Sequence, residues 1–265
     1  MSFTLRILGT ASAMPISDRN PSAQVLCVQG RLFLIDCGEG TQQMMRKLHL
    51  SFLKVEAVFI SHIHGDHVFG LFGLLSTMTM YNRTQTLHIF GPEALRSIIR
   101  FYLSFFADGS NYTIEFHEVK VNGCEHIYDS KDVRVSAFPL HHKIECYGYR
   151  FDEILSERSL EKRRAVSYAY CSDTMPFPAL SDFVKGVMVL YHECTYTQDL
   201  ADKAGKYFHS STSDAAKCAL ACGAEKLIIG HYSSRIRDVK VYETECKKIF
   251  PETIAAVDGD IFEIK

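Results

Sequence analysis

The stretch that decides the fold is His62-Ile63-His64-Gly65-Asp66-His67. Four candidate metal ligands fall within six residues, and a regular helix or strand would spread them over different faces. A loop that leaves the end of a strand can turn all four toward one point, and Gly65 permits the tight backbone that this requires. The apolar residues on either side, Val58-Phe59-Ile60 and Val68-Phe69, indicate that the loop emerges from the core.

The chemistry of this loop is that of a metal centre. Imidazole and carboxylate groups suit zinc, with manganese or iron as alternatives. Four ligands so close together would crowd one metal that must also hold water and substrate, so two metals sharing a bridging carboxylate fit better. The competing interpretation is a chance histidine-rich surface loop. With 12 histidines in 265 residues, three within six positions are rare by chance.

A two-metal centre needs further ligands, and ends of strands hold ligand geometry better than loop tips. Three candidates follow apolar stretches that are typical of strands: His141-His142 after residues 133–140, Asp173 after 165–171, and His231 after 226–230. A lone histidine at the end of a strand is often structural. Together with the cluster, however, these residues complete the ligand set that two metals require.

The bulk properties are those of an ordinary globular protein, with 47% hydrophobic and 23% charged residues. A net charge of −2 disfavours a globally basic nucleic-acid binder, although a local basic patch is compatible with it. The nine cysteines are odd in number and irregularly spaced, which favours reduced thiols in the cytoplasm. No leader and no apolar run of membrane-spanning length is visible, so we expect no membrane partner.

The chain shows no internal repeat and no Pro/Gly-rich linker, which predicts one domain over residues 1–265. Strand and helix patterns alternate in two strand-rich halves, which predicts an α/β fold with helices outside two sheets. The expected strands are 3–8, 24–28, 31–35, 55–60, 86–90, several within 114–138, 147–151, 165–171, 184–191 and 226–229. The strands 24–28 and 31–35 are expected to form a hairpin about Gln29-Gly30. The expected helices are 41–48, 68–80, 92–106, 212–222 and 239–250.

Further motifs occur in order along nearly the whole chain. They are Leu8-Gly9-Thr10-Ala11-Ser12, Phe33 to Gln42, His142 to Arg150, Ser172-Asp173-Thr174, His192-Glu193-Cys194-Thr195-Tyr196, His209-Ser210-Ser211-Thr212, and His231 to Arg235. With the histidine cluster, this set resembles ribonuclease Z, the tRNA 3′-processing endonuclease of the metallo-β-lactamase superfamily. The resemblance implies a four-layer αββα sandwich of metallo-β-lactamase type.

The resemblance also implies a ligand set for two zinc ions per subunit. One ion would be held by His62, His64 and His142, and the other by Asp66, His67 and His231, with Asp173 between them. His142 rather than His141 is chosen because it stands six residues before Gly148, as the family motif requires.

The same resemblance implies roles in catalysis. Asp66 would orient the attacking water or accept its proton, and His209 would protonate the leaving oxygen or stabilise phosphate charge. Asp36 would orient the histidine loop, and Glu193 would support His209. The competing interpretations are a cap for Asp36 and purely structural roles for Glu193 and His209. Arg235 would meet a substrate phosphate or remain solvated.

The function implied is a metal-dependent endoribonuclease that removes the 3′ trailer from precursor tRNA, acting as a homodimer and not on DNA. One departure from the family is the short segment 151–172, which leaves no room for the long arm that clamps tRNA in many members. Its basic group, Arg158, Lys162, Arg163 and Arg164, is best explained as a solvated helix face. The missing arm favours the alternative function, a phosphodiesterase for small molecules such as cyclic nucleotides. A β-lactamase, a thiolesterase and a non-catalytic RNA-binding protein are less consistent with the motifs.

Overall fold

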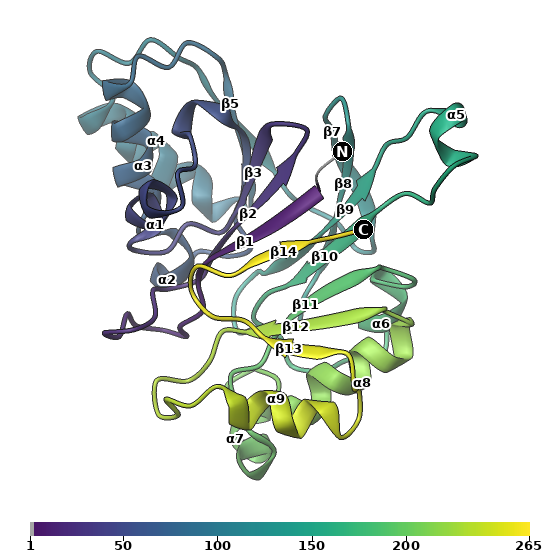
Figure 1. Cartoon of the computed structure of the whole chain (residues 1–265). Helices are drawn as coiled ribbons and strands as arrows, with labels where there is room; N and C mark the ends of the chain where they lie inside the picture. Colours follow the sequence, from purple (N-terminus) through teal and green to yellow (C-terminus); the bar gives the residue numbers. More distant parts are fainter. Residues whose placement is uncertain (1–2) are drawn as a thin grey trace. The chain divides into compact units, whose positions relative to one another are not determined.

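The computed structural model describes residues 3–265, apart from the side chain of Arg158. The chain divides into two compact units, which we describe separately. Unit 1 comprises the chain up to residue 120 together with residues 257–263, and unit 2 comprises residues 121–256 and 264–265. Each unit contains one mixed sheet of seven strands (Figure 1).

The sheet of unit 1 has parallel pairing from β3 to β6 and antiparallel pairing on its other side. Its strands, in spatial order, are β14 (Ile261–Glu263), β1 (Phe3–Gly9), β2 (Ala23–Val28), β3 (Arg31–Ile35), β4 (Val55–Phe59), β5 (Leu87–Gly91) and β6 (Ile114–Glu118). Its helices are α1 (Thr41–Lys47), the short 3-10 helix η1 (Phe52–Lys54), α2 (Gly65–Val68), α3 (Leu71–Met80) and α4 (Ala94–Phe106).

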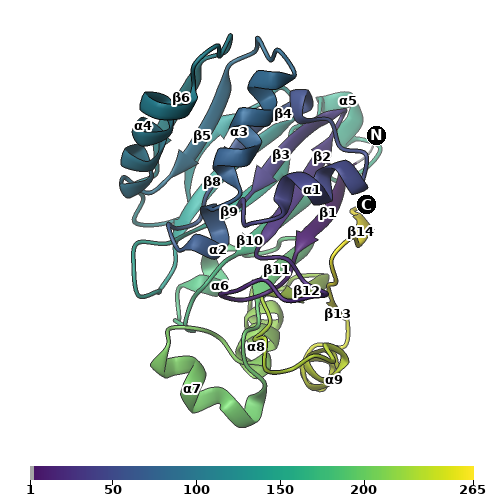
Figure 2. The ribbon, with the colours of Figure 1, turned by 90° about the vertical axis from the view of Figure 1, so that its left-hand side faces the viewer.

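Helices α1, α3 and α4 cover one face of this sheet (Figure 2). Leu74, Leu75 and Met78 of α3 pack with strand residues such as Leu34 and Val58 in a single apolar core. The β2–β3 hairpin turns at Gln29 and Gly30, which both have positive φ, as a two-residue hairpin turn requires. The expected hairpin is therefore confirmed.

The sheet of unit 2 has parallel pairing from β10 to β13. Its strands, in spatial order, are β13 (Thr253–Ala255), β12 (Lys226–Gly230), β11 (Val189–Glu193), β10 (Ser167–Cys171), β9 (Tyr147–Glu153), β8 (Val133–Pro139) and β7 (Glu125–Asp129). Its helices are α5 (Glu157–Leu160), α6 (Leu180–Phe183), the 3-10 helix η2 (Gln198–Leu200), α7 (Ala201–Lys206), α8 (Thr212–Cys222) and α9 (Lys240–Lys247).

Helix α8 has the bounds expected from the sequence because both of its ends carry local signals. Ser211 and Asp214 form a reciprocal capping box at its start, and Gly223 ends it with a φ of 71°. Its small residues, such as Ala215 and Ala219, pack into the core beneath β11 and β12.

Two expected elements were wrong in extent. The helix expected over residues 68–80 is instead two helices, α2 and α3, separated at Phe69 and Gly70. The strand expected over 184–191 begins only at Val189, because helix α6 and a turn at Gly186, with a φ of 66°, precede it. The apolar residues between 184 and 191 are all buried, and a buried helix and a buried strand are equally apolar. Hydrophobicity alone therefore could not distinguish the helix and turn from a longer strand.

Within the described residues, no helix combines the length and apolar character needed to cross a membrane. The expectation of a single domain over residues 1–265 stays a prediction.

Close backbone contacts in unit 1 hold the loop after β3 against α2. The N–H of Gly70 donates to the carbonyl of Cys37 at 2.8 Å, and the N–H of Cys37 donates to the carbonyl of His67 at 2.8 Å. A Cβ atom on Gly70 would lie 2.1 Å from the carbonyl oxygen of Gly38. The approach of these two segments therefore depends on glycine.

We predict that Gly70→Ala lowers the free energy of unfolding by about 1–3 kcal/mol, because the added methyl group forces the two segments apart. Chemical denaturation measures this change. The matched control is Gly205→Ala in α7, where a Cβ meets nothing within 4 Å and alanine favours the helix. Equal stability of the two variants would contradict the prediction.

Candidate metal centre

The histidine loop of unit 1 follows the carboxyl ends of two parallel strands. Asp36 directly follows β3, and Ser61 and His62 come just after β4. Because β3 and β4 are parallel neighbours, their carboxyl ends lie at the same edge of the sheet. The N–H of Asp36 donates to the carbonyl of Phe59 at 2.8 Å, which fixes the two loops together at this edge.

The carboxylate of Asp36 is fully buried and accepts three hydrogen bonds. The donors are the N–H of Ser61 at 2.7 Å, the hydroxyl of Ser61 at 2.9 Å and Nδ1 of His67 at 2.7 Å. Nδ1 of His62 lies 3.0 Å from the Ser61 hydroxyl and can donate to it. One carboxylate thus fixes the orientation of two histidine rings.

With their Nδ1 atoms occupied in this way, His62 and His67 keep Nε2 as the atom with a lone pair available to a metal. Nε2 of His62 lies 3.0 Å from Nδ1 of His64. Nε2 of His67 lies 3.5 Å from Oδ2 of Asp66, and that oxygen accepts the N–H of Ala13 at 2.7 Å. Unit 1 therefore brings together all four ligands expected from the cluster, with Asp36 beneath them.

In unit 2, three parallel strands place their carboxyl ends side by side. Asp173 follows β10 after one residue, Glu193 ends β11, and His231 directly follows β12. The strands β10, β11 and β12 are consecutive neighbours. The expectation that Asp173 and His231 follow the ends of strands is confirmed, and their roles stay predictions.

Asp173 lies between two histidines of this unit. Its Oδ1 is 3.2 Å from Nε2 of His231, and its Oδ2 is 3.8 Å from Nε2 of His142. Nδ1 of His142 donates to the carbonyl of Phe208 at 3.0 Å, and burial lowers the pKa of this histidine, so the neutral ring presents Nε2 to Asp173. His141 instead stacks on Phe177, with ring centroids 4.0 Å apart. The geometry therefore favours His142 over His141 as a ligand.

Glu193 is the buried acceptor of unit 2. It accepts Nδ1–H of His209 at 3.0 Å, the N–H of Ser210 at 2.8 Å and the hydroxyl of Thr195 at 2.8 Å. Burial is the largest single influence and opposes the charged carboxylate, but interactions that include those with His209 and His231 lower the pKa of Glu193 overall. His209 is thereby held with Nε2 directed away from Glu193.

Several of these positions have an uncommon backbone conformation. Asp36 has a φ of 55°, His231 a φ of 60°, and Phe208, which precedes His209, a φ of 60°. Non-glycine residues pay a conformational cost for positive φ, and such residues concentrate at functional sites. The strain here coincides with the candidate ligands and their supports.

Two hydroxyl groups near the candidate ligands were not predicted from the sequence. The hydroxyl of Ser61 connects His62 to Asp36. The hydroxyl oxygen of Thr195 lies 2.9 Å from Nδ1 of His231, and the same hydroxyl donates to Glu193. Both residues lie inside the motifs that were quoted, directly before or near a candidate ligand. A search for hydroxyl residues adjacent to each ligand would have found them.

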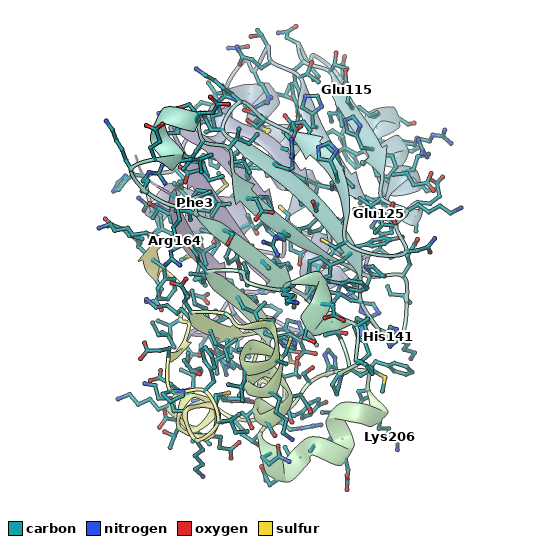
Figure 3. All side chains as sticks on the ribbon, turned by 90° about the vertical axis from the view of Figure 1, so that its right-hand side faces the viewer. Phe3, Glu115, Glu125, His141, Arg164 and Lys206 are labelled. Atoms are coloured by element: carbon teal, nitrogen blue, oxygen red, sulfur yellow. The ribbon has the colours of Figure 1, made fainter. Side chains whose placement is uncertain are left out.

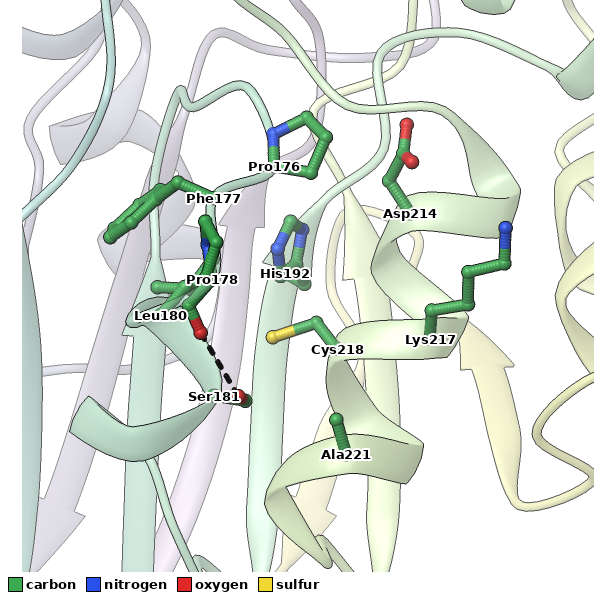
Figure 4. A pocket seen from close by; sticks show the side chains of 10 residues that line it. All are labelled: Pro176, Phe177, Pro178, Leu180, Ser181, His192, Asp214, Lys217, Cys218 and Ala221. Atoms are coloured by element: carbon green, nitrogen blue, oxygen red, sulfur yellow. Dashed lines mark hydrogen bonds between the residues drawn. The ribbon is translucent and has the colours of Figure 1, made fainter.

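A pocket of about 430 Å³ lies in unit 2 between α6 and α8 (Figure 4). Pro176, Phe177 and Pro178 line one side, and Lys217 and Cys218 of α8 line the other. His192 at its floor has Nδ1 donating to the carbonyl of Glu193 at 2.7 Å. Burial lowers the pKa of His192, which fits a neutral structural histidine.

The segment between β9 and β10 holds no long arm, only the four-residue helix α5. Arg163 forms two hydrogen bonds of 2.7 Å with Glu153, and Arg164, labelled in Figure 3, pairs with Glu225. The side chain of Arg158 lies outside the described residues. The paired arginines fit the expected solvated face, and Arg235 is exposed.

Comparison with solved structures defines the class of protein. The chain superposes on the short form of human tRNase Z (ELAC1) with a TM-score of 0.83 at 28% identity, covering 99% of both chains. It matches the metallo-β-lactamase fold protein YhfI from Bacillus subtilis with a TM-score of 0.81 at 19% identity, covering 98% of both chains. The expected α/β fold of metallo-β-lactamase type is confirmed.

Comparison with sequences narrows the class to a family. Relatives named Ribonuclease Z are 35% identical in Porphyromonas gingivalis, over 96% of this chain and 97% of theirs, and 36% identical in Cytophaga hutchinsonii, over 100% and 97%. The chain therefore belongs to the ribonuclease Z family. Residues 3–250 also match the family model described as Anti-Pycsar protein Apyc1, so the chain belongs to that family as well.

The residues present fit the divalent metal that the family and fold imply. Four of the candidate imidazoles have their Nδ1 atom within hydrogen-bonding distance of a protein group: the Ser61 hydroxyl for His62, Asp36 for His67, the Phe208 carbonyl for His142 and the Thr195 hydroxyl for His231. Such support fixes the tautomer and raises the basicity of a ligand. Histidine nitrogens and carboxylate oxygens are the donors that zinc, manganese and iron accept.

We predict that Asp36→Asn weakens zinc binding about 10- to 100-fold, because an amide cannot accept all three hydrogen bonds that hold Ser61 and His67. Equilibrium dialysis against buffered zinc measures the change. Asp108→Asn, at an exposed turn, is the control and should bind as the original chain does. An unchanged zinc affinity of Asp36→Asn would show that Asp36 does not support the metal ligands.

Proposed function

We propose that the chain is an endoribonuclease that removes the 3′ trailer of precursor tRNA by hydrolysis of a phosphodiester bond. The observation that carries this proposal is membership of the ribonuclease Z family together with fixed histidine and carboxylate groups at the strand ends of both units. We also propose that residues 1–265 act as one hydrolase domain in the cytoplasm. Nine free cysteines, six of them buried, fit a reducing compartment.

For the metal centre, we propose two zinc ions with the ligands implied by the motif order. One set is His62, His64 and His142, the second is Asp66, His67 and His231, and Asp173 belongs to both. Bound divalent ions supply charge neutralisation for the phosphate and acidify water for attack. The support from this chain is the hydrogen bonding within each unit that fixes the orientation of the rings of His62, His67, His142 and His231.

His209 is proposed as the acid that protonates the leaving 3′ oxygen. Glu193 holds its Nδ1–H at 3.0 Å and stabilises the charged ring, so that a proton on Nε2 can be delivered to the substrate. Thr195, Ser210 and the N–H of Thr174, at 3.2 Å, keep the Glu193 carboxylate in place. Asp66 is proposed to orient the attacking water or accept its proton.

We further propose that the chain forms a homodimer through helix α4. The C-terminal half of this helix exposes an aromatic face, in which Phe101 and Phe105 have ring centroids 4.9 Å apart and Phe106 lies within 6.4 Å of Phe105. The exposed fraction of Phe105 is 69%. A contiguous exposed apolar surface of this kind marks a protein interface, and a second copy is the partner expected for this family.

We predict that His209→Ala lowers the rate of precursor cleavage about 10²- to 10⁴-fold while zinc content is retained, because the acid is lost and the ligands are not. The assay uses a trailer-bearing precursor tRNA, with His126→Ala, an exposed histidine on β7, as control. A parallel assay on a cyclic nucleotide tests the alternative phosphodiesterase. Turnover of that nucleotide alone, with the precursor left intact, would contradict the proposed function.

We predict that Phe105→Glu converts the dimer to a monomer, because a carboxylate would be desolvated at the interface. Sedimentation equilibrium should give twice the mass of the chain before the substitution and the single mass after it. Leu220→Glu, equally exposed on α8 in unit 2, should leave the dimer intact. A monomeric original chain, or a dimeric Phe105→Glu variant, would refute the interface.

A further inference from the structure

Three potential ligands outside the family motifs come together on unit 1. His88 lies on β5, and Glu115 and His117 lie on its parallel neighbour β6, the outermost strand of the described sheet. The register pairs His88 with Glu115 and Phe90 with His117. Side chains two residues apart share a face of a strand, so all three project from the same face. Glu115 is labelled at the surface in Figure 3.

The donor atoms of these side chains have the spacing of a coordination site. Nδ1 of His88 is 3.1 Å from Nε2 of His117 and 3.3 Å from Oε2 of Glu115, and that oxygen is 3.9 Å from Nε2 of His117. Metal–ligand bonds of about 2.0–2.1 Å in a tetrahedron separate the donors by about 3.3 Å. The three distances bracket this value.

Hydrogen bonds among the three groups explain these distances less well than a bound cation does. Each neutral imidazole carries one N–H, and the carboxylate carries none. If His88 donates to His117, no proton lies between His88 and Glu115, and lone pairs face each other there. If Nδ1–H of His88 donates to Glu115, then Nε2 of His117, which lies 3.1 Å from the same Nδ1, must face that N–H as well. A cation accepts lone pairs from all three atoms at once.

The surroundings hold the ligands in place and leave them accessible. The ring of His117 stacks on buried Phe90, with centroids 4.5 Å apart and an interplanar angle of 13°. The exposed fractions of the side chains are 25% for His88, 40% for His117 and 51% for Glu115. Solvent and ions can therefore reach a site whose two imidazoles are already oriented.

We propose that His88, Glu115 and His117 bind one divalent transition-metal ion and thereby join the edge strand β6 to β5. Two imidazoles and one carboxylate suit zinc, cobalt or nickel, and leave a fourth position for water. The site is distinct from the proposed catalytic ligands, none of which it uses. It does not depend on the proposed nuclease function, and its failure would leave that function untouched.

The test is a zinc titration of the intact protein, with bound metal counted by mass spectrometry after equilibrium dialysis. The original chain should bind one more ion per chain than His117→Ala, and Glu115→Ala should bind that ion at least about tenfold more weakly. His49→Asn is the matched control, because asparagine tolerates the φ of 56° at that exposed position, and it should keep the full number of ions.

Two further measurements on Glu115→Ala, its cleavage rate and its melting temperature with zinc, distinguish loss of the metal site from misfolding. Glu115 is exposed, so Glu115→Ala should fold normally and keep its rate of precursor cleavage, and zinc should raise its melting temperature less than that of the original chain. The proposal is overturned if the original chain, His117→Ala and Glu115→Ala bind equal numbers of ions with equal affinity.

Discussion

The hydrogen bonds of the Asp36 carboxylate are the interaction on which the histidine loop depends. Asp36 directly follows β3, adopts a φ of 55°, and accepts three hydrogen bonds from Ser61 and His67 while fully buried. A buried carboxylate without such donors would cost several kcal/mol, so its presence requires the loop to close over it. The orientation of His62 and His67 follows from this one constraint.

Unit 2 uses the same physical device with different residues. Glu193 ends a parallel strand, is fully buried, and holds His209, Ser210 and Thr195, and Thr195 in turn contacts His231. In both units, therefore, a buried acidic residue orders imidazoles at the carboxyl edge of a sheet. A site built in this way is preorganised, because each candidate ligand is held before metal or substrate arrives.

The sequence was sufficient for elements whose limits are encoded locally. Helix α8 has its capping box and terminal glycine, and the β2–β3 hairpin has Gln29-Gly30, so both were predicted closely. The sequence was insufficient where tertiary contacts set the limits of an element. Helices α2 and α3 separate near Gly70, where the backbone lies against Gly38. Strand β11 begins later than expected because a turn at Gly186 precedes it. The candidate ligands were predicted from motif order, whereas the group of His88, Glu115 and His117 needed the fold to bring residues distant in the sequence together.

The central claim is the proposal that His64 and His142 are both metal ligands on which cleavage depends. Its most direct test compares His64→Ala from unit 1 with His142→Ala from unit 2, measuring bound zinc and precursor tRNA cleavage on the same samples. We predict that each variant loses bound zinc and cleavage together. Full zinc content with undiminished cleavage in either variant would contradict it.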